Sequence, residues 1–319
     1  MNTHKKLWRR ARQALTVAFF ILVPALLFTV LKNLDWQEVR QALASYRWST
    51  LGVAAGVTLC SFALFSSFDL LGRHYTGHHL PARRVLPLAF VCYAFNLNLS
   101  AWVGGIALRY RLYSRLGLKV STITRILSLG LLTNWVGYFV VAGSLFACGL
   151  PKLPAGMEIG NTGLRLIGAT LLLVAVAYLL ACAFATRRTW RFGKHTITLP
   201  GIRLAALQTL MGACNWALMA LVVFILLPKG AAYPTVLAVL MISSIAGVIT
   251  HIPAGLGVLE TVFLTLLQGT YGKGTLLAAL IGYRAIYFLL PLLIATLTYL
   301  LLERLASQRS AGERSQSTG

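Results

Sequence analysis

The sequence predicts an all-α, polytopic membrane protein, and three observations support that fold class. Charged residues make up only 11% of the 319 residues and hydrophobic residues 58%, whereas a soluble domain has roughly 25% charged residues. The net charge of +22 comes from Lys and Arg that fall between apolar stretches, which is typical of membrane topology and not of a nucleic-acid surface. The third observation is a series of eight apolar segments, at approximately residues 14–31, 49–72, 85–108, 126–149, 163–185, 203–228, 236–269 and 275–302.

The first segment, residues 14–31, is close to the ~20 residues that cross a bilayer. Five basic residues precede it, and the flank that follows, Lys32-Asn33-Leu34-Asp35, offers no small-residue cleavage site. We therefore expect an uncleaved signal-anchor with its N-terminus in the cytoplasm. The expected organisation is a basic cytoplasmic N-terminus at 1–13, one integral membrane domain at 14–302, and a polar, disordered cytoplasmic tail at 303–319.

The distribution of basic residues tests how many segments cross the membrane, because cytoplasmic loops carry an excess of Lys and Arg. If all eight segments cross, 13 basic residues lie inside and 14 outside. If the third and seventh segments are re-entrant, 21 lie inside, 6 lie outside and 2 fall within spans. The second distribution has the expected bias. The sequence thus predicts six full transmembrane helices and two re-entrant broken-helix hairpins that enter from opposite faces.

Both predicted hairpins are interrupted near their middle. The break in the third segment is "NLNLSAWVGG" (Asn96 to Gly105), and the break in the seventh lies within "ITHIPAGLGVLETVF" (Ile249 to Phe263). The halves, such as Val85 to Phe95, have about eleven residues and are too short to span. Broken helices are tolerated at membrane depth only where they are buried in protein or line a wet cavity, so the breaks predict a polar interior.

The two hairpins suggest an internal repeat. A shift of 151 residues aligns Gly104 with Gly255 and Arg109 with Glu260. Hairpins that enter from opposite faces would make such a repeat inverted, as in many transporters. One matched glycine and two opposite charges are the evidence for the repeat. The sequence leaves open whether the repeat exists.

Charged residues in apolar segments are the first candidates for function, because a charge facing lipid costs roughly 2.5–3.5 kcal/mol. Glu260 directly follows the second break, and Arg284 lies too deep in the last segment for easy snorkelling. Arg109 begins the basic patch "RYRLYSRLGLK" and shares a helical face with Tyr113. We expect Arg109 and Arg284 to be the partners of Glu260. The remainder of the patch reads as a cytoplasmic rim that holds lipid headgroups nonspecifically.

Helices that begin near Gly104 and Leu256 would direct unpaired backbone N–H groups at an anion, such as a phospholipid phosphate. Asn96 and Asn98 either cap a half-helix or contact that headgroup. The expected substrate-binding residues are Arg109, Glu260, Arg284, Asn96, Asn98 and Tyr113. The expected re-entrant turns contain Gly104, Gly105, Pro253, Gly255 and Gly257.

Other polar residues have simpler interpretations. Asp69 precedes Arg73 by four residues and is expected to form a surface ion pair with it. Asn134 and Asn215 are expected to make interhelical hydrogen bonds. The cluster His74, His78 and His79 lacks an accompanying acidic or cysteine ligand, so we expect no metal and no cofactor. The five cysteines lie within apolar segments and are interpreted as small hydrophobic residues.

At these residues the sequence resembles the transmembrane, lipid-flipping domain of bacterial lysylphosphatidylglycerol synthases of the MprF type and their stand-alone inner-membrane relatives of the YbhN type. The likeness rests on "NLNLSAWVGGIALRYRLY" (96–113), "PAGLGVLE" (253–260) and "YRAIYFLLP" (283–291), and it covers nearly the whole chain. The chain departs from the family's turn at Ala254, where glycine is usual. The resemblance implies that Arg109, Glu260 and Arg284 surround a lipid-headgroup cavity.

These features together predict an inner-membrane lipid transporter of the flippase type, with both termini cytoplasmic, that handles an anionic or aminoacylated phospholipid. No part of the chain resembles the soluble aminoacyl-transferase domain of the synthases, and no nucleophile triad, phosphate-binding loop or HExxH pattern occurs, so we expect no enzyme activity. The alternative is a noncatalytic partner or regulator of a phospholipid-synthesising enzyme. An intramembrane lipid-modifying enzyme is the third possibility, and no nucleic-acid partner is expected.

Overall fold

The structure, a computed structural model, describes residues 37, 41, 44, 46–99, 105–153, 160–185, 189–192, 195–228, 230–250, 252, 255–267 and 269–302. Four sequence predictions lie outside these residues: the first apolar segment 14–31, the basic N-terminus, the polar tail 303–319, and the positions Gly104 and Pro253 of the two turns.

The described chain is almost entirely α-helical, which confirms the predicted all-α membrane fold. Its helices are α3 (Trp48–Ser66), α4 (Phe68–Thr76), α5 (Ala82–Asn98), α6 (Leu108–Arg115), α7 (Val120–Ala147), α8 (Gly160–Phe184), α9 (Ile202–Leu226), α10 (Tyr233–Thr250), α11 (Val258–Leu267) and α12 (Lys273–Tyr283). Residues 105–107 form a π-helical turn ahead of α6, and α12 continues through the π-helix η3 (Arg284–Leu289) to Leu302.

A small antiparallel β-hairpin, β1 (Thr189–Phe192) and β2 (His195–Thr198), lies between α8 and α9. The hairpin was not predicted, although both strands contain aromatic or β-branched residues, which is a strand signal. The hairpin is tied to the helices by Tyr75, whose hydroxyl donates to the Thr198 carbonyl at 2.5 Å.

Six described helices are long and apolar enough to cross a membrane: Trp48–Thr76, Val120–Ala147, Gly160–Phe184, Ile202–Leu226, Tyr233–Thr250 and Lys273–Leu302. Five of them coincide with predicted full spans. The sixth, α10, is the first half of the predicted second hairpin and has 18 residues.

The predicted half-helices of about eleven residues are therefore wrong for the first half of each hairpin, because α5 has 17 residues and α10 has 18. Both helices start before the apolar run, α5 at Ala82 just after Pro81, which occupies its N-cap. The second halves are short as expected, with 8 residues in α6 and 10 in α11. Re-entry itself stays a prediction.

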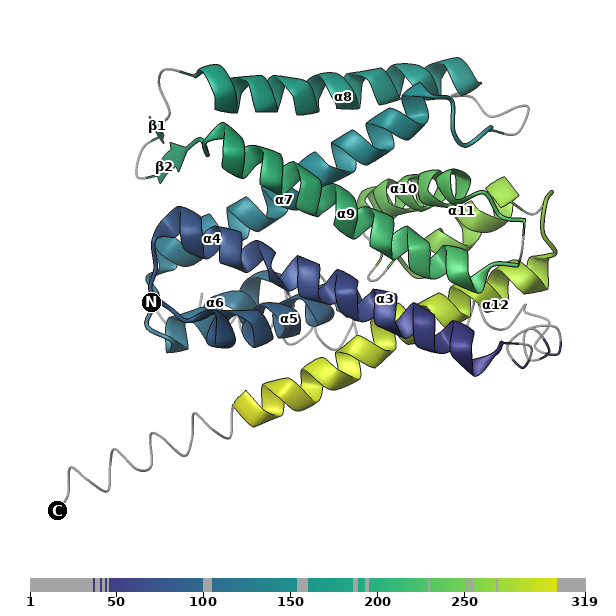
Figure 1. Cartoon of the computed structure of the whole chain (residues 1–319), viewed down its shortest axis with the longest axis horizontal. Coiled ribbons are helices and arrows are strands. Elements are labelled where there is room, and N and C mark those ends of the chain that lie inside the picture. Colours follow the sequence, from purple (N-terminus) through teal and green to yellow (C-terminus); the bar gives the residue numbers. More distant parts are fainter. Residues whose placement is uncertain are drawn as a thin grey trace, which may run out of the picture.

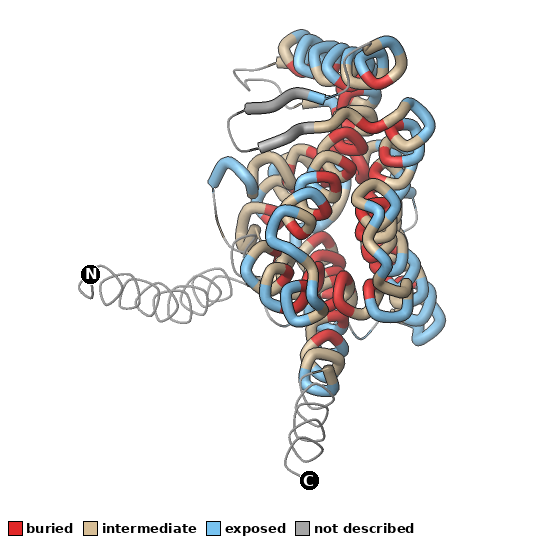
Figure 2. The backbone as a smooth tube through the Cα atoms, turned by 90° about the vertical axis from the view of Figure 1, so that its left-hand side faces the viewer, coloured by how far each residue is buried: buried red, intermediate tan, exposed pale blue. Residues whose placement is uncertain are grey.

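The two hairpins occupy opposite ends of the helix bundle (Figure 1). The α5–α6 pair lies beside α4, at the end where the β-hairpin is found, and α10 and α11 lie toward the other end. Long helices α3, α7 and α9 run between the two ends. Buried residues follow the middle of the bundle while exposed residues cover its outside (Figure 2), and α8, at one edge, turns an apolar face outward that includes Leu173, 70% exposed.

Close helix packing is built on glycine where α7 crosses α9. A Cβ on Gly137 would collide with the backbone of Gly212, and one on Gly212 would collide with the Thr133 carbonyl. Small residues allow such backbone approach in membrane bundles. This crossing fixes the spacing of α7 and α9.

A buried chain of hydrogen bonds ties four helices together. The Tyr93 hydroxyl on α5 lies 3.2 Å from that of Tyr287 on η3, which lies 2.7 Å from the Ser61 hydroxyl on α3. Ser61 in turn donates to the Asn215 side chain on α9 at 2.9 Å. The interhelical hydrogen bond predicted for Asn215 is thus confirmed.

Candidate functional site

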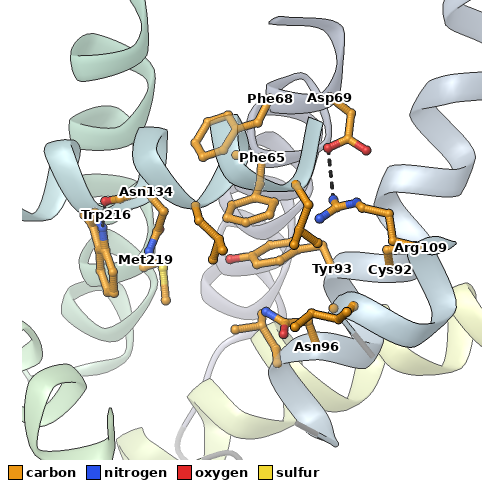
Figure 3. A pocket seen from close by; sticks show the side chains of 16 residues that line it. Phe65, Phe68, Asp69, Cys92, Tyr93, Asn96, Arg109, Asn134, Trp216 and Met219 are labelled. Atoms are coloured by element: carbon orange, nitrogen blue, oxygen red, sulfur yellow. Dashed lines mark hydrogen bonds and ion pairs between the residues drawn. The ribbon is translucent and has the colours of Figure 1, made fainter. Parts of the chain in front are cut away.

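A cavity of about 220 Å³ lies between the α5–α6 hairpin and α7, with α3, α4 and α9 completing its wall. Most of its lining is apolar. The polar residues among those that line it are Asp69, Tyr93, Asn96, Arg109 and Asn134. In Figure 3, Asp69 and Arg109 lie at one end, Asn134, Trp216 and Met219 at the other, and Tyr93 and Asn96 between them.

An ion pair closes the charged end of the cavity. Arg109 Nη2 on α6 donates to Asp69 Oδ1 on α4 at 2.9 Å, and the Tyr113 hydroxyl donates to Asp69 Oδ2 at 2.7 Å. Asp69 is 1% exposed and Arg109 8% exposed. The expected surface pair of Asp69 with Arg73 is therefore wrong: the packing of α4 on α5 and α7 buries the carboxylate and turns it to an arginine 40 residues along the chain.

Arg109 retains hydrogen-bonding capacity that nothing in the described chain uses. Its Nε is buried and has no hydrogen-bond partner among the described residues. A buried donor left without a partner costs about 1–3 kcal/mol, and guanidinium groups are suited to bidentate contacts with phosphate or carboxylate. Arg109 is among the residues that line the cavity, so a small shift of its side chain would present this unused donor to an anionic group placed there.

Asn96 and Gly105 form the part of the cavity wall closest to the first break. A Cβ added to Gly105 would lie 2.6 Å from Asn96 Oδ1, so glycine leaves room for the amide of Asn96. The side chain of Asn96 makes no hydrogen bond with any described residue, and it lies in the wall. It can therefore offer an amide to a bound molecule.

Glu260 and Arg284 form a second ion pair at the α10–α11 turn. Arg284 Nε donates to Glu260 Oε1 at 2.5 Å, and Arg284 Nη2 donates to Glu260 Oε2 and to the Gly255 carbonyl, each at 3.0 Å. The Gly257 N–H also donates to Glu260 Oε2, at 2.9 Å. Positive φ angles of 57° at Gly255 and 78° at Gly257 explain why glycine occupies both positions.

Asn98 caps α5 and reaches η3. Its amide donates to the Ala94 carbonyl at 2.8 Å and to the Phe288 carbonyl at 3.1 Å. The second acceptor lies in the π-helix that starts at Arg284, where the wider turn changes the backbone bonding. Asn98 thereby links the first hairpin to the helix that holds the second.

The predicted site residues thus fall into two groups. Arg109, Asn96 and Gly105 line the cavity, and Tyr113 supports it through Asp69. Gly255 and Gly257 lie in the α10–α11 turn, where Glu260 of α11 and Arg284 of η3 contact them, and none of the four lines the cavity. Glu260 is paired with Arg284, as expected, whereas its other expected partner Arg109 is paired with Asp69.

Several cavity residues were not expected from the sequence. Asp69 carried a signal, a carboxylate at the inner end of an apolar segment, but the local spacing to Arg73 favoured another partner. Tyr93, Trp216 and Met219 resemble any core side chain in sequence. The backbone carbonyl of Asn134 accepts from Trp216 Nε1 at 3.2 Å, whereas the interhelical bond predicted for its side chain is not found among the described residues, and that side chain lies in the cavity wall. Among the described residues, no group of three or more His, Cys, Asp or Glu side chains could hold a metal ion.

Comparison with known proteins places the chain among membrane proteins of one family. The sequence profile of a family described as the lysylphosphatidylglycerol synthase TM region matches residues 13–295. Inner membrane protein YbhN of Escherichia coli is 47% identical over 305 residues, which cover 95% of this chain and 96% of that protein. An uncharacterized protein of Synechocystis is 28% identical over 322 residues, covering 100% and 99% of the two chains.

The family match covers most of the chain, and the E. coli relative is similar over nearly its full length. Both agree with the resemblance inferred from residues 96–113, 253–260 and 283–291. This chain is a multi-pass membrane protein that belongs to the lysylphosphatidylglycerol synthase transmembrane-region family.

Proposed function

We propose that this chain is a bacterial inner-membrane lipid transporter of the flippase type, which takes the anionic headgroup of a phospholipid into the cavity at Arg109. In this proposal both termini are cytoplasmic, and the headgroup crosses between the hairpins while the acyl chains remain among the lipids. Asn96 would hold the headgroup beside Arg109, and Tyr113 would hold Asp69 in place.

One observation carries the proposal: Arg109, whose buried Nε has no hydrogen-bond partner in the described chain, is one of the residues that line a cavity. Ionisable residues at membrane depth generally mark ion or substrate pathways. Asp69 stabilises the positive charge of Arg109 when the cavity holds no ligand, and it uses only Nη2. In this proposal a small shift of the buried guanidinium exposes its Nε edge to a phosphate oxygen, while the Nη2 contact with Asp69 persists.

Two further observations support a transport role. The two hairpins lie at opposite ends of the bundle (Figure 1), an arrangement compatible with entry from opposite faces and with the restored bias of basic residues. The E. coli relative is described as an inner membrane protein, which favours the same location for this chain.

The Glu260–Arg284 pair receives a different role in this proposal. Both Glu260 oxygens already accept hydrogen bonds, and Arg284 donates to Glu260 and to Gly255. We assign this pair to holding the α10–α11 turn closed, which leaves Arg109 as the headgroup contact.

The test is translocation of tail-labelled fluorescent phosphatidylglycerol in vesicles of phosphatidylethanolamine and phosphatidylglycerol. Arg109→Gln alone would leave Asp69 buried without its partner, so the double variant Asp69→Asn with Arg109→Gln, which removes both charges, is compared with it. Arg111→Gln, an exposed arginine on the same helix, is the matched control. We expect a loss of at least about tenfold in rate in both Arg109 variants, equivalent to ~1.4 kcal/mol, and a wild-type rate in the control.

Wild-type translocation in the folded double variant would exclude Arg109 as the headgroup contact. Absence of translocation in the wild-type protein itself, together with capture of a lipid-synthesising enzyme, would instead favour the regulatory alternative. Mass spectrometry of lipids retained after gentle purification, wild type against the double variant, would identify the headgroup class.

A further inference from the structure

The cavity is too small to enclose a whole phospholipid. Its volume of about 220 Å³ lies below the ~300–1,000 Å³ of pockets that enclose a drug-sized ligand, and a phospholipid is larger than such a ligand. A headgroup fits, but two acyl chains do not. If the headgroup lies at Arg109, the rest of the molecule must leave the cavity through its wall.

The wall differs in exposure from one side to the other. Cys92, Tyr93, Phe68 and Arg109 are buried. On α7, by contrast, the lining residues Leu127, Gly130, Leu131 and Asn134 follow one helical face, and Leu131 is 52% exposed. Leu131 therefore belongs both to the cavity wall and to the outer surface of α7.

Gly130 contributes no side chain to the part of the cavity wall that α7 forms. A Cβ added there would meet nothing within 4 Å, so no close packing requires glycine at this position. Glycine in a helix interior is destabilising by roughly 0.5–1 kcal/mol relative to alanine. Its presence beside the exposed lining residue Leu131 leaves this part of the wall without a side chain.

We propose that the face of α7 formed by Leu127, Gly130 and Leu131 is the exit through which the acyl chains of the bound lipid leave the cavity. The occupant is the hydrocarbon part of the same phospholipid whose headgroup contacts Arg109, so this inference rests on the proposed function. The continuity of an apolar, outward-facing stripe with a charged cavity end matches the two chemically different halves of a phospholipid.

The test fills the proposed exit without touching the charged end. Gly130→Phe adds a large apolar side chain at a half-buried glycine where an added Cβ meets nothing within 4 Å, and Gly56→Phe on α3, an exposed helical glycine that also has nothing within 4 Å, is the matched control. We measure translocation of tail-labelled phosphatidylglycerol in the vesicles described above. We also measure binding of glycerophosphoglycerol, the water-soluble headgroup without acyl chains.

We expect Gly130→Phe to slow translocation by about tenfold or more, equivalent to ~1.4 kcal/mol, because the phenyl ring occupies the space that the acyl chains need, while headgroup binding and the Gly56→Phe variant stay at wild-type values. Wild-type translocation in Gly130→Phe, with translocation lost in the Arg109 variants, overturns the exit and leaves the proposed function standing. Equal losses in Gly130→Phe and Gly56→Phe also overturn it. Wild-type translocation in the Arg109 double variant refutes the proposed function itself.

A photo-crosslinking measurement keeps the inference testable if Gly130→Phe fails to fold. A benzophenone amino acid is placed at Leu131 or, as a control, at Leu173 on the lipid-facing side of α8. We expect lipids crosslinked at Leu131 to be enriched in phosphatidylglycerol over the vesicle composition, and the enrichment to disappear with the Arg109 double variant. Crosslinks that follow the bulk composition at both positions would overturn the proposal.

Discussion

Each of the two hairpins is held by an ion pair, to which the first hairpin contributes an arginine and the second a glutamate. In the first, Arg109 on α6 pairs with Asp69 on the neighbouring helix α4, and in the second, Glu260 on α11 pairs with Arg284 on η3. Each pair ties the short second half of a hairpin to a helix of an adjacent span. A π-helical turn lies close to each arginine, at residues 105–107 and at Arg284–Leu289.

The hairpins differ in what their ion pairs leave unused. The carboxylate of Glu260 joins Arg284 to the backbone of its own turn through Gly257, and Arg284 reaches Gly255. Arg109 makes one contact with Asp69 and keeps a buried Nε without a partner in the described chain, beside a cavity. The same kind of pair can therefore hold a turn closed or present a donor to a ligand, depending on how completely it is satisfied.

The largest expected loss of stability comes from breaking the ion pair between Glu260 and Arg284. Arg284→Gln leaves Glu260 without its charge partner and should lower the free energy of unfolding by about 3 kcal/mol. The measurement is the thermal unfolding midpoint in neutral detergent, with and without phosphatidylglycerol. We expect no recovery from the lipid, because this pair is assigned no headgroup.

The double variant Glu260→Gln with Arg284→Gln is the control for the first prediction. It leaves no uncompensated charge and should lose less stability than Arg284→Gln alone. A single variant as stable as the wild type would mean that the pair does not hold the turn.

Breaking the first pair should give a smaller, lipid-dependent effect. Asp69→Asn leaves Arg109 buried without a counter-ion, and we expect a loss of about 2 kcal/mol in neutral detergent. A ligand that binds only the folded state restores ~2.7 kcal/mol at a hundred times its Kd, so phosphatidylglycerol should recover most of this loss. Failure of the lipid to raise the unfolding midpoint of Asp69→Asn more than that of Arg284→Gln would remove the distinction between the hairpins.

Tyr113 stabilises the ion pair between Asp69 and Arg109 through its hydrogen bond to Asp69. Tyr113→Phe removes the hydroxyl that donates to Asp69 Oδ2 at 2.7 Å and keeps the ring. Hydrogen bonds to charged groups contribute about 1.5–3 kcal/mol, and we expect the lower end because the Arg109 contact remains. Chemical denaturation in detergent measures the loss, and Tyr110→Phe, on the same helix, is the comparison; equal losses in the two variants would contradict a specific role for Tyr113.

The smallest expected effect separates the turn glycines. Gly255→Ala should cost about 1 kcal/mol, because an L-residue is strained at a φ of 57° although its side chain has open space. Gly105→Ala should leave stability nearly unchanged but push the Asn96 amide out of place, since the clash is with the end of a movable side chain. Lipid retention should therefore fall for Gly105→Ala and not for Gly255→Ala, which mass spectrometry can measure.

The sequence was sufficient for the features that depend on local composition. The apolar segments correspond to the described helices from α3 onward, and both breaks lie where glycine, proline and asparagine cluster. The pairing of Glu260 with Arg284 could be expected because each charge lies in an apolar segment and needs a partner. These inferences need only the cost of placing charge or free backbone in hydrocarbon.

The features that depend on how helices pack could not be read in the same way. Asp69 was assigned to Arg73 by spacing along one helix, whereas its burial requires α4 to lie against α5, α6 and α7. The sequence predicted that Arg109 and Arg284 share one cavity. It could not show that Arg284 has its hydrogen bonds filled in the described chain while Arg109 does not, because that difference depends on the contacts of Gly255 and Gly257 with the Glu260–Arg284 pair. The sequence shows which charged residues lie in apolar segments and therefore need a partner. Which residue becomes that partner depends on how the helices pack.

The crossing of α7 and α9 has a consequence for how headgroup selectivity can change. Gly137 lies one helical turn from Asn134, and Gly212 lies one turn from Trp216. Asn134 and Trp216 both line the cavity, at the end away from Arg109. A single methyl group at either glycine would force the two backbones apart and carry both wall residues with them. A homologue could therefore widen its chamber for a bulkier headgroup while every residue in contact with that headgroup stays the same.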